Sequence, residues 1–109
     1  MRQTTRTSGT EQVLSSIQLA ELRERLEEQR RFRVAQLDEL RTIDPDLSSE
    51  VTDVLAAGAK VALHDVIAAL HRMDVGSYGR CVECGDPIPL ARLEVIPAVS
   101  ECLPCRARV

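Results

Sequence analysis

The four cysteines of this chain form two close pairs in its C-terminal quarter, Cys81 with Cys84 and Cys102 with Cys105. Two residues stand inside each pair, and residues 85–101 separate the pairs. A two-residue spacer lets one backbone turn aim both sulfurs at one ion, and the long spacer lets the second pair fold back onto that ion. The spacing therefore predicts one structural Zn²⁺ held by four thiolates.

Two other interpretations of the cysteines were weighed against zinc. Two disulfides would require an oxidising compartment, whereas residues 1–7 are polar and lack the apolar stretch of a secretory signal. A thioredoxin-like redox pair sits at a strand-to-helix junction, and no such pattern surrounds Cys81 or Cys102. Four thiolates leave no open coordination position, so the zinc is expected to stabilise the fold rather than to catalyse a reaction.

Composition favours helices and limits the partners. The chain has 109 residues, a net charge of −3, one Phe, one Tyr and no Trp. This size fits one domain or a small zinc module on a stalk, and the abundance of alanine, leucine and glutamate fits helices packed side by side. A net negative chain does not bind nucleic acid by bulk electrostatics. No segment is interpreted as a membrane span, and a cytoplasmic protein is expected.

Two long helices are predicted before the segment that contains the cysteines. No Gly or Pro interrupts residues 11–43, which are predicted as one amphipathic helix. Leu19, Leu22 and Leu26 recur there at spacings of three and four, Leu37 and Leu40 resume the pattern, and Val13 and Ile17 extend the apolar face backwards. Pro45 disfavours helix at the residue before it. A second helix then runs to about Val75, starting from Asp44 as N-cap or from Ser48 or Ser49. Gly58 interrupts this helix, and the small residues Ala56, Ala57 and Ala59 are interpreted as allowing close approach to the first helix.

These elements predict a mainly α fold. Two helices of about thirty residues joined by a short turn are antiparallel neighbours, which gives a long coiled-coil hairpin followed by a small C-terminal four-cysteine zinc-finger module. The expected division is a disordered tail over residues 1–10, the hairpin over residues 11–75 with its tip near residues 44–50, and the module over residues 76–109.

The module resembles the DksA/TraR zinc-finger family. That family's pattern is Tyr-Gly-x-Cys-x-x-Cys-Gly-x-x-Ile, then Arg-Leu, a proline and a final Cys-x-x-Cys. The residues of this chain that carry the resemblance are Tyr78-Gly79-Arg80-Cys81-Val82-Glu83-Cys84-Gly85-Asp86-Pro87-Ile88, Arg92-Leu93, Pro97, Cys102 and Cys105.

The resemblance implies a regulator of bacterial RNA polymerase. Family members insert the tip of a coiled coil into the secondary channel of the polymerase, and they act without a DNA sequence signal. They often act together with the nucleotide alarmone of the stringent response. The family's tip motif is Asp-x-x-Asp-x-Ala, and from Asp44 this chain has Leu47 and Ser49 at the second and third motif positions. Alarmone dependence therefore stays open.

The acidic residues of the expected tip are Asp44, Asp46 and Glu50. They are candidate contacts with the polymerase, and an equal alternative is that they only cap a helix and complement its positive end. Two other function classes also stay open, a zinc-stabilised coiled-coil adaptor for another protein and a zinc-ribbon nucleic-acid binder. An enzyme is not expected, because no nucleophile with a base, no phosphate loop and no open metal site is present.

Overall fold

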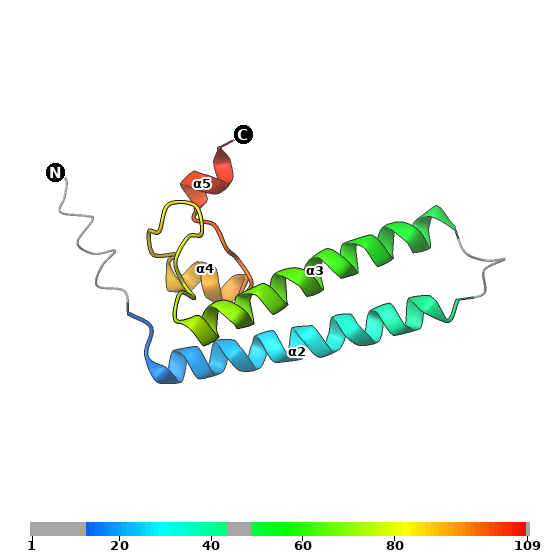
Figure 1. The fold of residues 1–109 in the computed structure, drawn as a ribbon, viewed down its shortest axis with the longest axis horizontal. Coiled ribbons are helices and arrows are strands. Elements are labelled where there is room, and N and C mark those ends of the chain that lie inside the picture. Colours follow the sequence, from blue (N-terminus) through cyan, green and yellow to red (C-terminus); the bar gives the residue numbers. More distant parts are fainter. Residues whose placement is uncertain (1–12, 44–48, 109) are drawn as a thin grey trace.

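The computed structural model describes residues 13–43 and 49–108 of the chain. Its described helices are α2 (Ser16–Arg41), α3 (Glu50–Val75), α4 (Leu90–Val95) and α5 (Leu103–Ala107), and these residues form no strand. Helices α2 and α3 run antiparallel, and residues 76–108 fold against one end of the pair (Figure 1). The molecule measures 61 × 34 × 21 Å. The predicted mainly α hairpin with a small C-terminal module is therefore confirmed.

The first long helix begins later than the sequence suggested. Helix α2 starts at Ser16 because Ser15 forms a capping box with Gln18: the Gln18 N–H donates to Ser15 Oγ at 3.0 Å, and the Ser15 N–H donates to Gln18 Oε1 at 2.9 Å. The predicted start near Glu11 is wrong for Val13 and Leu14, which precede the helix. Both helices have 26 residues, slightly fewer than expected.

The second long helix begins at Glu50, with Ser49 as the residue at its N-cap. This is one of the two predicted starts, and the other, with Asp44 as N-cap, lies outside the described residues. Helix α3 ends at Gly76, which has a φ of +83° and donates its N–H to the carbonyls of Arg72 and Met73. Glycine enters this left-handed conformation without steric cost, so the chain can turn from the hairpin into the C-terminal residues.

The end of the hairpin that carries residues 76–108, here called the base, holds one continuous core. Its buried residues come from α2, α3 and the C-terminal residues: Leu22, Leu26, Val66, Ala69, Leu70, Tyr78, Cys81, Ile88, Leu93, Val99, Cys102 and Cys105. The Tyr78 hydroxyl donates to the Pro97 carbonyl at 2.8 Å. Burial raises the pKa of Tyr78 to about 12, although Arg72 and Arg25 act in the opposite direction.

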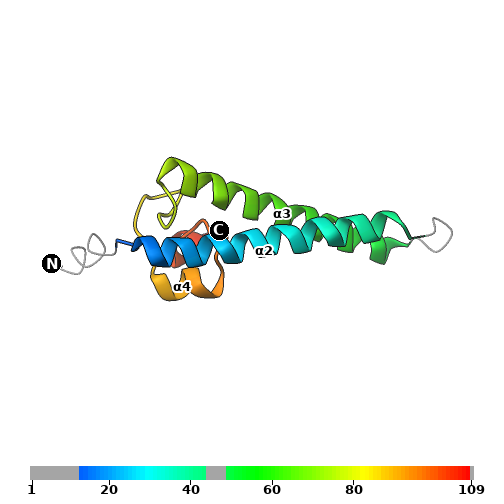
Figure 2. The same cartoon turned by 90° about the horizontal axis from the view of Figure 1, so that it is seen from below.

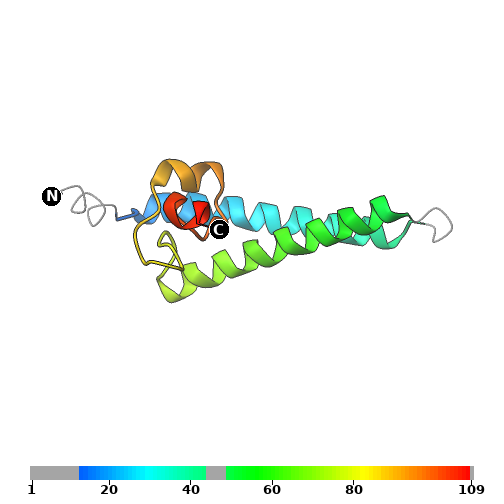
Figure 3. The ribbon, with the colours of Figure 1, turned by 90° about the horizontal axis from the view of Figure 1, so that it is seen from above.

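Polar contacts join the same three parts of the base. Arg25 on α2 donates to the carbonyl of Glu94, and Arg72 on α3 donates to the carbonyl of Val99 at 3.4 Å. The views along the other directions show α4 packed beside α2 at this end (Figures 2 and 3). The segment that contains the cysteines thus packs against both long helices.

The rest of the hairpin, here called the arm, comprises residues 34–43 and 49–61. Among its described residues only Ala59 is buried, whereas Val51, Val54, Leu55 and Val61 are all exposed. Gly58 is exposed as well, and a Cβ built on it meets no atom within 4 Å. Gly58 therefore does not approach α2, whereas Ala59, one of the small residues predicted to allow close approach, is buried.

Helix α3 also has an unusually apolar composition. Among the described residues it is the one helix long and apolar enough to cross a membrane, with a mean hydropathy of 1.4 and 22% of that window buried. The interpretation that no segment resembles a span is therefore wrong for α3 by length and composition. Such criteria alone are weak support for insertion, because core helices of soluble proteins also meet them.

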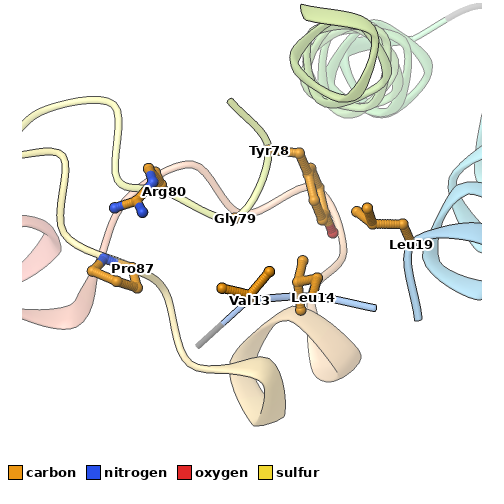
Figure 4. A pocket seen from close by; sticks show the side chains of 7 residues that line it. All are labelled: Val13, Leu14, Leu19, Tyr78, Gly79, Arg80 and Pro87. Atoms are coloured by element: carbon orange, nitrogen blue, oxygen red, sulfur yellow. The ribbon is translucent and has the colours of Figure 1, made fainter. Parts of the chain in front are cut away.

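A short apolar segment before α2 covers the start of the C-terminal residues. Val13 and Leu14 lie across Gly79, and the Tyr78 ring faces Leu19 (Figure 4). A Cβ on Gly79 would lie 3.2 Å from Leu14 Cδ1, and Gly79 has a φ of +89°. Leu14 thus packs against Gly79 ahead of α2, outside the helix that was predicted from residue 11. Residues 1–10, predicted as a disordered tail, lie outside the described residues.

Candidate metal centre

The first cysteine pair sits on a tight turn. The Gly85 N–H donates to the Cys81 carbonyl at 2.9 Å, and the Cys81 N–H donates to the Asp86 carbonyl at 2.8 Å. Gly85 has a φ of +81°, a conformation that disfavours side chains. The turn therefore needs glycine directly after Cys84, as the sequence suggested.

Two further bonds hold this turn in place. Arg80 and Pro87 form an isolated antiparallel bridge, made by the Cys81-to-Asp86 bond and by a bond in which the Ile88 N–H donates to the Gly79 carbonyl at 2.7 Å. The Arg80 guanidinium also donates to the Gly85 carbonyl at 3.1 Å. Ile88 is fully buried in the base, so the turn is fixed to the hydrophobic core.

The second pair sits at the start of a short helix. Cys102 is the N-cap residue of α5 and Cys105 lies within this helix, where the Arg106 N–H donates to the Cys102 carbonyl at 2.9 Å. The Val82 N–H donates to the Ser100 carbonyl at 2.9 Å, which ties the segment before α5 to the first turn. The two pairs are thereby held facing each other.

The four sulfur atoms of Cys81, Cys84, Cys102 and Cys105 all lie within 4.8 Å of one another. The Cys84 and Cys102 sulfurs are 3.7 Å apart, much farther than the roughly 2 Å of a disulfide. Four sulfurs at about 2.3 Å from a central Zn²⁺ in a regular tetrahedron would be about 3.8 Å apart. The cluster fits a four-thiolate zinc ion in both donor type and spacing, and the protein carries one structural Zn²⁺.

The pKa values of the thiols move in opposite directions. Burial raises the pKa of Cys81, but hydrogen bonds from the backbone around Cys102, Cys84 and Glu83 outweigh it and lower this pKa to about 6. The hydrogen bond with the Cys102 side chain, together with burial, raises the pKa of Cys105 to about 12. Four adjacent thiols cannot all ionise unless a cation offsets their charge, and a central divalent ion supplies that cation.

Exposure and hydrogen bonding differ among the four sites. Cys84 is exposed, and the other three cysteines are buried. The Glu83 backbone N–H donates to the Cys81 sulfur at 3.4 Å, and the Arg108 guanidinium donates to the Cys105 sulfur at 3.2 Å. Four sulfurs around a tetrahedral Zn²⁺ would leave no coordination position open for a substrate, so this geometry suits a structural metal.

Glu50 is the one predicted tip residue that the structure describes, and it lies at the opposite end of the hairpin from the cysteines. Glu50 is the first residue of α3 and is exposed, so it can complement the positive helix end and still meet a partner. Asp44 and Asp46 lie outside the described residues.

Sequence reasoning missed two contributors to the centre. Leu14 falls within the stretch of residues 11–43 predicted as helix, and only the folded chain shows it against Gly79. Arg108 follows Cys105 by three residues, and this spacing on a short helix is the one sequence signal that points to its contact with the sulfur.

Comparison with known proteins agrees with this geometry. Residues 76–109 match the family described as the prokaryotic dksA/traR C4-type zinc finger. A solved structure, the transcription factor DksA2 from Pseudomonas aeruginosa, superposes with a TM-score of 0.71 at 26% identity over 94% of this chain and 93% of that chain. The likeness therefore includes the hairpin as well as the zinc finger.

Two curated relatives are similar over shorter segments. The uncharacterized protein YlyA of Bacillus subtilis is 50% identical over 38 residues, which cover 35% of this chain and 31% of YlyA. An uncharacterized protein of Aquifex aeolicus is 34% identical over 62 residues, which cover 57% of this chain and 43% of that protein. The chain matches less than half of the length of either relative.

Proposed function

We propose that the chain regulates bacterial transcription by binding RNA polymerase directly, because residues 76–109 match the DksA/TraR C4-type zinc finger and the fold resembles that of the transcription factor DksA2 over most of the chain. In this proposal the arm enters the secondary channel of the polymerase, and the zinc-bearing base stays outside. The protein acts in the cytoplasm, and it needs no DNA sequence signal of its own.

The observation that carries the proposal is the free arm. Helices of 26 residues extend about 39 Å at 1.5 Å per residue, and only their base end is covered by the C-terminal residues (Figure 1). A paired-helix rod is slender enough to enter a channel that would exclude a globular domain. The base is wider and would stop at the channel rim.

The surface of the arm suits a protein partner. Val51, Val54, Leu55 and Val61 lie at helical spacings on one face of α3, and all are exposed. Gly58 lies on the same face with open space above it, at a cost of roughly 0.5–1 kcal/mol relative to alanine in a helix interior. An exposed apolar face with a glycine at its centre favours a partner that approaches the backbone closely.

The residues proposed to act on the polymerase are Asp44, Asp46 and Glu50. Their carboxylates would be drawn to a magnesium site or to the basic residues around it. The proposed zinc ligands are Cys81, Cys84, Cys102 and Cys105, whose task is to hold the base that aims the arm.

The test is binding of zinc-loaded protein to purified core RNA polymerase, with in vitro transcription as a second readout. Asp44→Asn/Asp46→Asn is compared with Glu21→Gln/Glu24→Gln, which removes the same charge from exposed positions near the base. We expect both variants to bind and only the tip variant to lose the effect on transcription. No polymerase binding by the wild type would contradict the proposal.

A second candidate is an adaptor for another protein, and the exposed apolar face of α3 is the observation that favours it. Binding to a different purified partner, with polymerase absent, would support the adaptor. Steep salt dependence of binding to nucleic acid would instead indicate a zinc-ribbon nucleic-acid binder.

A further inference from the structure

Arg108 is bound to Cys105 by both its backbone and its side chain. Its N–H donates to the Cys105 carbonyl at 3.2 Å, and its Nη2 donates to the Cys105 sulfur at 3.2 Å. Arg108 has an extended backbone conformation, with φ −73° and ψ 134°, and α5 ends before it. Its side chain points back toward Cys105 on the helix. The guanidinium thus lies against one sulfur of the cluster.

The charge of the centre explains what such a contact does. Four thiolates around one Zn²⁺ leave about two negative charges in excess. Of the hydrogen bonds to sulfur described above, the one from Glu83 comes from a neutral backbone amide, whereas the one from Arg108 comes from a full positive charge. Hydrogen bonds from a charged donor are roughly twice as strong as neutral ones.

We propose that Arg108 is a positioning residue of the zinc centre, which orients the Cys105 thiolate and offsets the excess negative charge of the zinc-thiolate cluster. Groups that hydrogen-bond to metal ligands in this way typically change metal affinity by about 10–100-fold. Arg108 is exposed, so solvent and salt reduce its contribution, and the expected effect is near the lower end of that range.

This role is distinct from a general effect of basic charge. Arg106 lies two residues earlier, is also exposed, and is not seen to contact a cysteine sulfur in the described structure. It provides a matched control, because Arg106→Gln and Arg108→Gln remove the same charge from the same segment. Arg108→Lys keeps the charge but loses the planar fork of donors.

The experiment measures the zinc dissociation constant of the whole chain by competition with a chelator of known affinity, and the rate of zinc release into excess chelator. Arg108→Gln should weaken zinc binding about tenfold and speed release by a similar factor, while Arg106→Gln changes both by less than about twofold. The difference should shrink when the salt concentration is raised. Far-UV circular dichroism of the zinc-loaded variants verifies that each one is folded.

Equal effects of the two substitutions would overturn the proposal, because a general electrostatic field would then suffice. Unchanged zinc binding in Arg108→Gln would also overturn it. The inference rests on the four cysteines as zinc ligands and not on polymerase binding. A wild-type chain that binds no zinc would therefore contradict both the ligand assignment and the role of Arg108. The proposed binding to polymerase is tested by its own experiment.

Discussion

The base and the arm of this hairpin use the same two helices in different ways. At the base, Leu26 on α2 and Val66 on α3 are buried together with Ile88 and Leu93 from the C-terminal residues. In the arm, the same α3 leaves Val54 and Val61 exposed at 69% and 61%. The difference shows that the zinc-bearing residues complete the core of the base, while nothing within the described chain completes the apolar face of the arm.

This contrast separates two sources of stability. The base combines buried apolar area with a metal centre, and in small modules the free energy of metal binding is also free energy of folding. The arm relies on helix pairing and on helical propensity, which stabilise isolated hairpins only weakly. Substitutions at the base should therefore affect folding, and substitutions in the arm should affect partner binding.

Removal of a proposed zinc ligand should have the largest effect. Cys81→Ser is expected to lose the bound zinc and to unfold the C-terminal residues, since the remaining thiols cannot fill the tetrahedron. Zinc content by atomic absorption and thermal melts measure both effects. Glu83→Gln, exposed between the two cysteines of the first pair, is the control and should retain the metal. An unchanged melt of Cys81→Ser with zinc retained would refute the assigned role.

A matched pair of leucine substitutions tests the comparison of the two regions directly. Leu26 is fully buried in the base and Leu55 is 49% exposed in the arm. Leu26→Ala should lower the free energy of unfolding by about 2–5 kcal/mol, and Leu55→Ala by less than about 1 kcal/mol. Urea denaturation of zinc-loaded protein measures both values. Equal losses would mean that the arm has a core of its own.

Tyr78 predicts a pH dependence that belongs to the base. Its pKa is raised by burial from 10.0 to about 12, so the folded state keeps the phenolic proton while the unfolded state loses it. Stability from this group is therefore fully present below pH 10 and is lost as the pH rises from 10 toward 12. Tyr78→Phe should be less stable at neutral pH by about 0.5–1.5 kcal/mol, because it loses the hydrogen bond to Pro97.

The measurement is the urea midpoint of both proteins between pH 9 and about 11.5, at fixed zinc and salt. The wild-type curve should fall more steeply than the Tyr78→Phe curve as the pH rises above 10. Parallel curves would show that the hydroxyl is not protected from solvent in the folded protein.

Gly58→Ala should give the smallest change in stability, and it should make the protein slightly more stable. A Cβ at this position enters open space, and alanine restricts the unfolded chain, so the free energy of unfolding should rise by about 0.5–1 kcal/mol. The same variant should bind its partner more weakly if the partner approaches the backbone at Gly58. A loss of stability would contradict the open face that distinguishes the arm from the base.

The sequence predicted the features that depend on local spacing. The intervals between the cysteines and the glycine after Cys84 are properties of single turns, and the paired helices follow from apolar periodicity broken at Pro45. Leu14 falls at the start of the stretch predicted as helix, whereas its contact with Gly79 involves a residue far along the chain. Composition also does not reveal which of the small residues around Gly58 is buried, and in the structure Ala59 is buried while Gly58 is exposed.

The contacts made by Arg108 lay beyond sequence reasoning on physical grounds. Its side chain reaches Cys105 only because α5 ends there and the backbone becomes extended. The capping box formed by Ser15 with Gln18 is a sequence signal for the start of α2, and it locates that start better than the apolar periodicity does.

The most direct test of the account is site-specific photocross-linking of zinc-loaded protein to core RNA polymerase. One cross-linker replaces Leu55 in the arm, and a control cross-linker replaces exposed Glu83 beside the metal centre. The account predicts that position 55 cross-links to residues lining the secondary channel and that position 83 does not. Folded, zinc-loaded protein whose position 55 yields no cross-link inside that channel would contradict the central claim that the arm is the part that enters the polymerase.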